Sequence, residues 1–306
     1  MLVTGASGFI GSFVAGYLQA NGCDVRAARR SGTSSELQAS EYAAAPDFSK
    51  PFDASPLVRG MDYIVHIAGL AHATETISEA AYMAINAEAA GRLATAARIE
   101  GVKRFIFMSS VRAQTGPSAL GIVTEDCPAA PTDAYGRSKL AGEAMVNQVL
   151  SGPATRAVVL RPVLVYGPGV RGNMAVLMRL ARTPWPLPVK GLHAKRSLLS
   201  RANLASAVLH AITAPHVASG TYLVADDEAL KVAEILDALR QGLGRAPGMF
   251  TVPQGPVKLA LKALGREGDL DRLFGDLCVS TGALRATGWR AQVPVRAGLA
   301  AAIRVA

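Results

Sequence analysis

The sequence has few cysteines, no cluster of metal ligands and no long apolar run. Its 306 residues include three cysteines, Cys23, Cys127 and Cys278, an odd number without a C-x-x-C spacing or a nearby histidine cluster. This usage argues against a disulfide framework and against a zinc site, and it indicates a reducing compartment. The apolar run AVVLRPVLVYG contains Arg161 and Pro162 and is too short to cross a bilayer, and no charged region precedes an apolar one at the N-terminus. We therefore expect a cytoplasmic protein without a metal site or a membrane partner.

Basic residues outnumber acidic ones but form no block. Lys and Arg total 32 against 23 Asp and Glu, which gives a formal net charge of +9 and an isoelectric point near 9.7. Because the basic residues are scattered, a solvated basic surface is favoured over a nucleic-acid-binding one. A positive net charge also suits an anionic ligand such as a phosphorylated cofactor. Half of the residues are hydrophobic and the mean hydropathy is +0.25, which is typical of a globular protein.

Apolar runs typical of strands alternate with helix-like runs through the first half of the chain. The strand-like runs include LVTG, MDYIVHIAG, RFIFMSS and RAVVLRPVLVYG, and the helix-like runs include FIGSFVAGYLQANG and YGRSKLAGEAMVNQVL. Strands that are apolar throughout and separated by helices predict a parallel sheet covered on both faces. We therefore predict an α/β fold, a doubly wound parallel Rossmann sheet, over residues 1–165. Gly22 and Gly101 should end the helices that precede them.

The composition changes after residue 166, where Pro and Gly recur every few residues, as in GPGVRGN and TPWPLP. This pattern predicts a smaller C-terminal α/β domain for the substrate over residues 166–306, from which segments can return to the first domain. Within it, EALKVAEILDALRQGLG predicts an amphipathic helix with Val232, Ile235 and Leu236 on its core-facing side.

A glycine-rich run, GASGFIG, follows the first apolar strand and precedes a helix-like run. In this context Gly5 allows the tight turn, Gly8 lets the backbone approach a pyrophosphate, and Gly11 lets the helix pack close to the sheet. The pyrophosphate would lie on the free N–H groups of the first helical turn. The run therefore predicts a dinucleotide site, with a glycine-rich turn that binds nothing as the alternative. The residues of the predicted cofactor site in this run are Gly5, Ser7, Gly8, Phe9, Ile10 and Gly11.

The spacing G-x-x-G-x-x-G resembles that of the short-chain dehydrogenase/reductase superfamily, whose extended branch typically carries TGASGFIG. The resemblance implies an NAD(P)-dependent enzyme. Relatives usually have a few residues before this strand, so Met1 comes late, and we expect fewer ladder hydrogen bonds to anchor the glycine loop.

The end of the second strand bears on the choice of cofactor. NAD sites usually place Asp or Glu there, about 20 residues beyond the glycines, whereas NADP sites use Arg to receive a 2′-phosphate. The run DVRAARRS ends in Arg29 and Arg30, which favours NADP over NAD, with solvated arginines as the alternative. Asp47 and Phe48 resemble the position at which the family contacts the adenine edge, and an ordinary turn aspartate is equally compatible with the sequence.

A serine, a tyrosine and a lysine follow in an order that suggests catalysis. Tyr135 and Lys139 are four residues apart in DAYGRSKLAGE, so a helix places them on one face. A neighbouring ammonium stabilises a phenolate and lowers the pKa of a tyrosine, which is about 10 in water. Ser110 ends the strand FIFMSS, 25 residues before Tyr135. In the family that the chain resembles, this serine hydrogen-bonds the substrate oxygen, the tyrosine transfers the proton and the lysine holds the nicotinamide ribose. Ser110, Tyr135 and Lys139 are therefore the predicted catalytic residues.

Further positions match landmarks of the same family. Ala68 and Gly69 match the turn after the fourth strand that lines the cofactor, and Asn86 matches a helix asparagine near it. The resemblance implies that these residues, together with Tyr135 and Lys139, belong to the cofactor site. His66 and His72 have no ligand constellation around them, so we expect ordinary strand or turn histidines and no metal.

The second half of the chain resembles the nucleotide-sugar epimerase/dehydratase group. The resemblance is carried by LRPVLVYGPG, GNMAVLMRL, KRSLLSRANLASAV and DRLFGDLCVSTGALRATGWR. It implies a UDP-sugar substrate, with Arg196 and Arg272 on its diphosphate and Asn173 as a further polar contact, and it implies a homodimer. Guanidinium groups suit a diphosphate, although a surface ion pair is an alternative for each arginine.

The sequence also departs from the pattern of the 4-epimerases. Leu164 stands where they often have Asn, Asn203 where many relatives have Asp, and VRAQTG replaces the VYG motif expected after Ser110. These departures weaken the match to a UDP-glucose 4-epimerase. The arginines at the end of the second strand and the C-terminal landmarks RLFG and GWR, which resemble the C4-reductase subgroup, favour a 4-keto-sugar reductase that consumes NADPH. A UDP-glucose or UDP-N-acetylglucosamine 4-epimerase that retains NAD is the alternative. A non-catalytic NAD(P) sensor or an RNA-binding relative represents a different class, and such proteins commonly lose the Tyr or the Lys.

Overall fold

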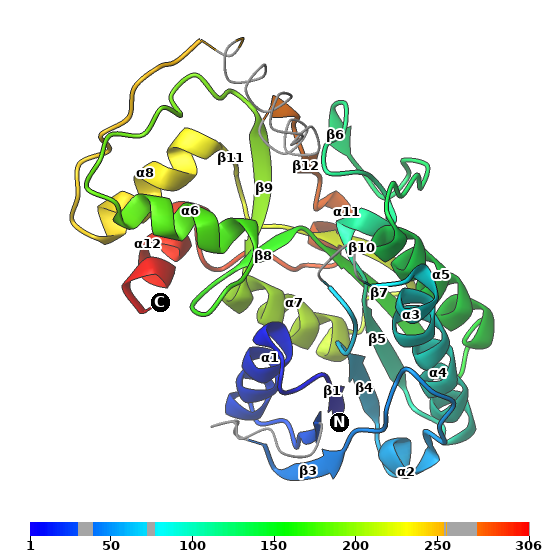
Figure 1. Ribbon diagram of the computed structural model, residues 1–306. Coiled ribbons are helices and arrows are strands. Elements are labelled where there is room, and N and C mark those ends of the chain that lie inside the picture. Colours follow the sequence, from blue (N-terminus) through cyan, green and yellow to red (C-terminus); the bar gives the residue numbers. More distant parts are fainter. Residues whose placement is uncertain (30–38, 72–76, 254, 256–273, 306) are drawn as a thin grey trace.

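A seven-stranded parallel sheet forms the centre of the protein (Figure 1). The computed structural model describes residues 1–29, 39–71, 77–253, 255 and 274–305. The strands of this sheet are Leu2–Thr4 (β1), Arg26–Arg29 (β2), Glu41–Ala44 (β3), Tyr63–His66 (β4), Arg104–Met108 (β5), Arg156–Pro162 (β7) and Gly220–Val224 (β10). Their spatial order is β10-β7-β5-β4-β1-β2-β3. The chain order reverses between β1 and β4, and this reversal is the switch point of a doubly wound sheet, where such folds bind their ligands.

Helices cover both faces of the sheet (Figure 1). Alternation along the strands builds a core on each side, because Val65 and Ile106 belong to one apolar cluster whereas their neighbours Ile64 and Phe105 belong to the other. This arrangement confirms the predicted doubly wound α/β fold. The helices on the first side are Phe9–Ala20 (α1) and Arg201–Thr213 (α7). Those on the second side are Ser55–Val58 (α2), Glu79–Met83 (α3), Ala89–Ile99 (α4) and Ala134–Val149 (α5), with the π-helical turn Ala84–Glu88 (η1) joining α3 to α4.

Glycines follow the ends of two of these helices. Gly22 comes two residues after α1 with φ +79°, and Gly101 comes two residues after α4 with φ +70°. This left-handed conformation costs other residues energy and suits the position after a helix, so the predicted helix ends are confirmed. No helix in the described part of the chain is long and apolar enough to span a membrane.

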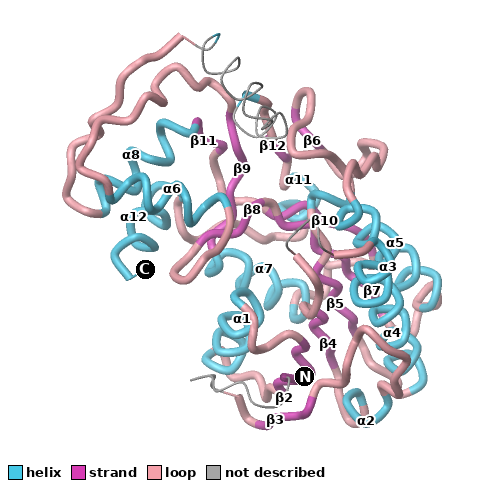
Figure 2. The backbone as a smooth tube through the Cα atoms, in the orientation of Figure 1, coloured by secondary structure: helices cyan, strands magenta, loops and turns pink. Residues whose placement is uncertain are grey.

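A smaller group of elements lies beyond one end of the large sheet (Figure 2). Its mixed sheet consists of Leu164–Tyr166 (β8), Lys195–Ser200 (β9) and Ala229–Lys231 (β11), in the order β11-β9-β8. Val232, Ile235 and Leu236 are buried in its core, as the amphipathic pattern predicts. Between β9 and β11 the chain returns to the large sheet as α7 and β10. The other elements of this part are Ile122–Val123 (β6), Asn173–Arg182 (α6), Val232–Gly242 (α8), Cys278–Val279 (β12), Gly282–Ala286 (α11) and Val295–Val305 (α12).

Asp226, directly after β10, connects the two parts. Its buried carboxylate accepts hydrogen bonds from the Ser200 backbone N–H at 3.0 Å, from Asn203 Nδ2 at 2.7 Å and from the Tyr166 hydroxyl at 2.8 Å. Asn203 Oδ1 in turn accepts from the backbone N–H of Val293 at 3.0 Å. The Asn203 side chain thus donates to Asp226 and accepts from Val293, as an amide can. An aspartate at position 203 would place a second carboxylate against the first, which explains the asparagine there.

The pKa of Asp226 leads to a prediction about stability and pH. Burial raises this pKa from 3.8 to about 6, against the hydrogen bonds that favour the carboxylate. Because the folded-state pKa is the higher one, the stabilisation is complete below the unfolded pKa and is lost as the pH rises through about 6. We expect the free energy of unfolding of the wild type to fall relative to that of Asp226→Asn by on the order of 3 kcal/mol between about pH 4 and about pH 8. Urea unfolding over this range measures both curves, and parallel curves would contradict the assignment.

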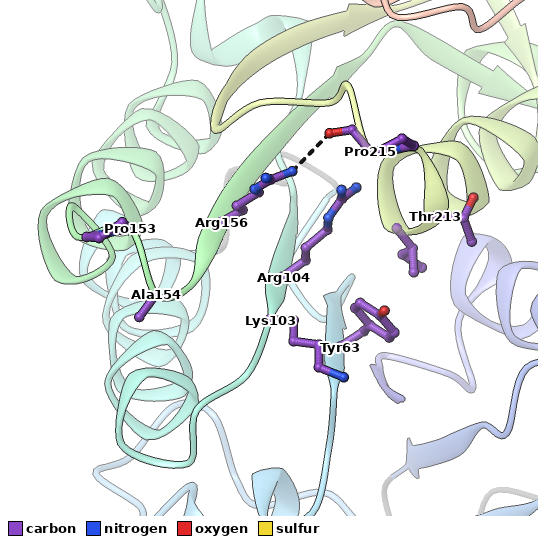
Figure 3. A pocket seen from close by; sticks show the side chains of 9 residues that line it. Tyr63, Lys103, Arg104, Pro153, Ala154, Arg156, Thr213 and Pro215 are labelled. Carbon is purple, nitrogen blue, oxygen red and sulfur yellow. Dashed lines mark hydrogen bonds between the residues drawn. The ribbon is translucent and has the colours of Figure 1, made fainter.

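A pocket of about 430 Å³ opens at the opposite edge of the sheet from the switch point (Figure 3). It lies at the amino ends of β4, β5 and β7. Arg104 Nη1 donates to the Ala211 carbonyl at 2.6 Å and Arg156 Nη1 to the Pro215 carbonyl at 3.0 Å. These carbonyls lie at and just beyond the C-terminal end of α7, where cations are stabilising. The two arginines therefore attach α7 to the sheet, and the pocket is distinct from the site at the carboxyl edge.

Candidate active site

The glycine loop lies between the end of β1 and the start of α1. Gly5 has φ +70°, and a Cβ on it would lie 2.7 Å from the Ala68 nitrogen; a Cβ on Gly11 would lie 2.1 Å from the Gly5 carbonyl oxygen. Both contacts are with backbone atoms, so neither position accepts a side chain without movement of the chain. Gly8 precedes the first helical residue and provides no side-chain cap. The N–H groups of Phe9, Ile10 and Gly11 consequently have no acceptor within the helix, and they fit the pyrophosphate of a dinucleotide, with exposed Ser7 beside them.

Two glycines of α1 form a matched pair for a test of this loop. We expect Gly11→Ala to destabilise the protein by about 1–3 kcal/mol, because its methyl group would overlap the Gly5 carbonyl. Nothing lies within 4 Å of a Cβ on Gly16, so Gly16→Ala should stabilise the helix by up to about 1 kcal/mol. Chemical unfolding of both variants, with titration of NADPH and NADH by fluorescence, measures the effects. Equal stability of the two variants would contradict the close approach.

The residues expected at the adenosine end lie at the carboxyl edge of the sheet. Arg29 ends β2, and its guanidinium carbon lies 4.3 Å from the centre of the Tyr42 ring. Arg30 lies outside the described residues. Asp47 accepts hydrogen bonds on Oδ1 from the Ser49 backbone N–H at 3.0 Å and from the Ser49 hydroxyl at 2.6 Å, and these bonds lower the pKa of its carboxyl. This is the geometry of an aspartate that stabilises a turn.

Phe48, the neighbour of Asp47, packs edge-on against His66, with ring centres 6.0 Å apart. His66 ends β4 and is fully buried, and its Nδ1 lies 2.7 Å from the Thr4 hydroxyl oxygen. Burial, assisted by the charge of Lys139, lowers the pKa of His66 to about 3, so the imidazole is neutral. His72 lies outside the described residues. Within the described ranges, no group of three or more His, Cys, Asp or Glu side chains could hold a metal ion.

The turn after β4 joins the loop to the lysine. A Cβ on Gly69 would lie 2.7 Å from Asn86 Oδ1 and 3.0 Å from Lys139 Nζ. Asn86 is fully buried in η1, where Oδ1 accepts from the Leu70 N–H at 2.8 Å and Nδ2 donates to the Ser138 hydroxyl at 2.9 Å. Ala68 thus lies against Gly5 of the glycine loop, and Gly69 lies against Lys139 of α5. The turn after β4 packs between the glycine loop and α5 with no room for a side chain on Gly69.

Ser110, Tyr135 and Lys139 meet where β5 ends against α5. The Ser110 hydroxyl acts to lower the pKa of the Tyr135 phenol, and Lys139 Nζ donates to the Met108 carbonyl at 2.9 Å. Lys139 is buried, and burial lowers the pKa of its ammonium to about 8, against the opposing charge of Glu143. The structure therefore brings together the three residues that the sequence analysis selects, beside the turn of Gly69.

One expectation about Tyr135 is wrong for this structure. The Tyr–Lys spacing led us to expect that the ammonium of Lys139 lowers the pKa of the phenol, whereas burial raises this pKa. The hydrogen bond from Ser110 and the charge of Arg112 act in the lowering direction but do not outweigh burial. The Lys139 ammonium is already bonded to the Met108 carbonyl. At neutral pH the phenol of Tyr135 therefore keeps its proton.

A buried ion pair behind these residues was not foreseen from the sequence. Arg161 Nε lies 2.9 Å from Glu143 Oε1 and Arg161 Nη2 lies 2.5 Å from Glu143 Oε2. Arg161 Nη1 also donates to Gln114 Oε1 at 3.0 Å, and the hydroxyl of Ser109, the neighbour of Ser110, donates to Glu143. Glu143 stands four residues after Lys139 on α5, and this helical spacing was the available signal.

The residues predicted for the substrate lie in the smaller part of the protein. Arg196, on β9, donates from Nη1 to the Pro117 carbonyl, in the loop that follows Ser110. Asn173 is exposed at the first position of α6, and Leu164 is partly exposed on β8. Arg272 lies outside the described residues. Arg196 is therefore the predicted substrate residue that the structure connects to the loop after Ser110, the predicted catalytic serine.

Comparisons with known proteins agree with this fold. The model of the NAD dependent epimerase/dehydratase family matches residues 1–225. The UDP-glucose 4-epimerase of Vibrio cholerae is 32% identical over 302 residues, which cover 95% of this chain and 90% of that protein. Among solved structures, UDP-glucuronic acid 4-epimerase from Bacillus cereus in complex with NAD has a TM-score of 0.78 at 19% identity, with 99% of this chain and 95% of that chain covered. RMD from Pseudomonas aeruginosa complexed with NADPH has a TM-score of 0.75 at 22% identity, with 99% and 98% covered.

The two solved structures confirm the fold, and the family model confirms the resemblance that the glycine run and the Ser–Tyr–Lys set suggested. The family is one of nicotinamide-dependent enzymes, and its model spans well over half of the sequence. The chain belongs to the NAD-dependent epimerase/dehydratase family.

Proposed function

We propose that the protein is an oxidoreductase for a nucleotide sugar, which exchanges a hydride and a proton at C4 of a UDP-hexose. The observation that carries the proposal is that Ser110, Tyr135 and Lys139 meet where β5 ends against α5, with Lys139 Nζ beside Gly69 at the same sheet edge as the glycine loop. The similarity to the Vibrio cholerae UDP-glucose 4-epimerase over 95% of the chain supports the UDP-sugar as substrate.

The roles that we propose for the residues are those that the family resemblance implies. A nicotinamide dinucleotide, bound on the loop of Gly5, Gly8 and Gly11, supplies the hydride chemistry. Lys139, buried next to Gly69, holds the cofactor's ribose. Ser110 donates a hydrogen bond to the sugar O4, and Tyr135 gives its hydroxyl proton to O4 as the C4 carbonyl becomes an alcohol. In the reverse direction Tyr135 takes that proton back.

A reductase that acts on a 4-keto sugar is the form of this chemistry that we propose first. Burial keeps Tyr135 protonated at neutral pH, which suits a proton donor. Arg29 at the end of β2 offers a guanidinium to the 2′-phosphate of NADPH, and β2 carries no Asp or Glu. A 4-epimerase with retained NAD is the second candidate, favoured by the 32% identity to a UDP-glucose 4-epimerase.

One pair of assays distinguishes the two candidates. The purified protein is incubated with UDP-galactose or UDP-N-acetylgalactosamine without added coenzyme, and separately with a UDP-4-keto-6-deoxy sugar and NADPH or NADH. Turnover only in the second assay is expected, with a preference for NADPH. Turnover only in the first would replace the reductase by the epimerase, and turnover in neither would contradict the proposed substrate class.

We also propose a homodimer, in which α4 and α5 pair with the same helices of a second copy. These helices pack against each other, and Ile99 at the end of α4 is 72% exposed. A molar mass of about twice the chain's 31.8 kDa by light scattering is the expected result.

A further inference from the structure

Arg112 lies directly beside the proposed proton donor. It stands two residues after Ser110, in the 3₁₀ turn Val111–Ala113 (η2), where the family resemblance leads one to expect a tyrosine. Its backbone N–H donates to Ser110 Oγ at 3.1 Å. Because this N–H occupies an acceptor position of the hydroxyl, the O–H of Ser110 is free to donate toward Tyr135.

The side chain of Arg112 is held by the first turn of the helix that carries Tyr135. Arg112 Nη2 lies 2.5 Å from Asp133 Oδ2, and the other oxygen of Asp133 accepts the Gly136 backbone N–H at 2.7 Å as the N-cap of α5. A Cβ on Gly136 would lie 2.2 Å from the Arg112 carbonyl oxygen. The turn with Arg112 and the helix with Tyr135 are thus in backbone contact, and Asp133 holds the guanidinium against the first turn of that helix.

One nitrogen of this guanidinium has no hydrogen-bond partner. Arg112 Nη1 is buried and unpaired among the described residues, although the Arg112 side chain as a whole is 20% exposed. A buried donor without a partner costs free energy. A cation kept at this cost next to a group that changes charge can act on that group through its electrostatic field.

The groups that face the phenol of Tyr135 come from four elements. The Ser110 hydroxyl and Arg112 come from the end of β5 and from η2, and Tyr82 on α3 has its ring centre 6.4 Å away. Asp133 is the N-cap residue of α5, the helix that carries Tyr135. Arg112 acts to lower the pKa of Tyr135 and Asp133 acts to raise it, so the ion pair has opposite effects from its two ends.

We propose that Arg112 is a positioning residue for Tyr135, whose guanidinium, oriented by Asp133, stabilises the negative charge that the phenol carries after it gives up its proton. The inference rests on the proposed function, because it gives Tyr135 the proton. It adds a second cation to the site besides Lys139. Arg112 stands where the family resemblance leads one to expect a tyrosine, and its side chain brings a positive charge that a tyrosine would not.

Two substitutions test the electrostatic effect of the Arg112–Asp133 ion pair on Tyr135, one by removing each charge. Arg112→Met removes the cation, and Asp133→Asn removes the anion while keeping an N-cap, because Asn caps helices as well as Asp does. The ionisation of Tyr135 is followed by the near-ultraviolet absorbance of tyrosinate during a pH titration, with the Tyr135→Phe protein as the blank. We expect Arg112→Met to raise the titration midpoint of Tyr135 by about one pH unit, and Asp133→Asn to lower it by a similar amount. Arg112→Lys should return the midpoint toward the wild-type value.

The pattern of shifts separates this role from a structural one. Loss of packing at the turn would move the midpoint in the same direction in both variants, and this result, or no shift in either, would overturn the proposal. Thermal unfolding checks that both variants are folded, and Arg112→Lys provides the comparison if Arg112→Met is not. The titration needs no substrate, so its failure is distinct from failure of the proposed function, which the turnover of Tyr135→Phe reports.

Discussion

Replacement of Tyr135 by phenylalanine is expected to lower turnover by about 10²–10⁴-fold, the usual contribution of a positioned proton donor. The substitution removes one oxygen and keeps the ring that packs beside Tyr82 at 6.4 Å. Ser110 alone cannot replace the lost proton, because the pKa of an alcohol is far above that of a phenol. The measurement is kcat of both proteins on the substrate that the wild type turns over in the assays above.

The binding of the coenzyme provides the control for this prediction. The glycine loop and Lys139 are unchanged in Tyr135→Phe, so NADPH or NADH should bind with an affinity within a few-fold of the wild-type value. Lost binding would mean that the substitution disturbed the cofactor site as a whole. A variant with full turnover would remove Tyr135 from the reaction and with it the mechanism given above.

The parts of the fold that sequence reasoning could predict depend on local rules. The glycine run could be interpreted because both glycines pack against backbone atoms. Gly11 lies against Gly5, and Gly5 lies against Ala68 after the neighbouring strand β4, so a side chain fits at neither position. Gly22 and Gly101 mark helix ends for a similarly local reason. The alternation of apolar strands and helices predicts the parallel sheet, and the seven strands of the structure have that arrangement.

Local rules could not predict contacts between residues that are far apart in the chain. Ser200 and Asn203 form one buried group with Asp226, yet most of α7 and all of β10 separate Asp226 from the other two residues in the chain. Asp226 itself follows β10, which returns to the large sheet from the second half of the sequence. No periodicity shows where a chain turns back, because the same apolar pattern fits a strand in either sheet.

The site illustrates the same limit in its electrostatics. The Tyr135–Lys139 spacing correctly places both residues on one helix at the end of β5, but the direction of the pKa of Tyr135 depends on burial and on what Lys139 contacts. Asp47 likewise follows the third strand as the sequence indicates, but its hydrogen bonds to Ser49 could not be predicted from the sequence. The sequence could predict which helix or strand carries each residue. The burial and the hydrogen-bond partners of each charged group required the three-dimensional structure.

The buried ion pair of Glu143 and Arg161 is expected to have the largest effect on stability. Both residues are more than nine-tenths buried, and the pair joins α5 to β7 directly behind Lys139. Arg161→Met would leave the Glu143 carboxylate buried without its cation, with the Ser109 hydroxyl as its remaining donor among the described residues. We expect a loss of about 3–5 kcal/mol in the free energy of unfolding, and a similar loss for Glu143→Leu, which strands the guanidinium.

The double variant Arg161→Met with Glu143→Leu distinguishes a charge effect from a packing effect. If the losses arise from uncompensated charge, removal of both partners should cost less than the sum of the single changes by about 1–3 kcal/mol, because no buried ion is left. Gln114 would still be held by its bonds to the carbonyls of Thr124 and Cys127, so the loop after Ser110 should keep its place. Urea unfolding of the four proteins completes the cycle. Additive losses would show that Glu143 and Arg161 act independently, and the explanation of the losses by uncompensated charge would then be wrong.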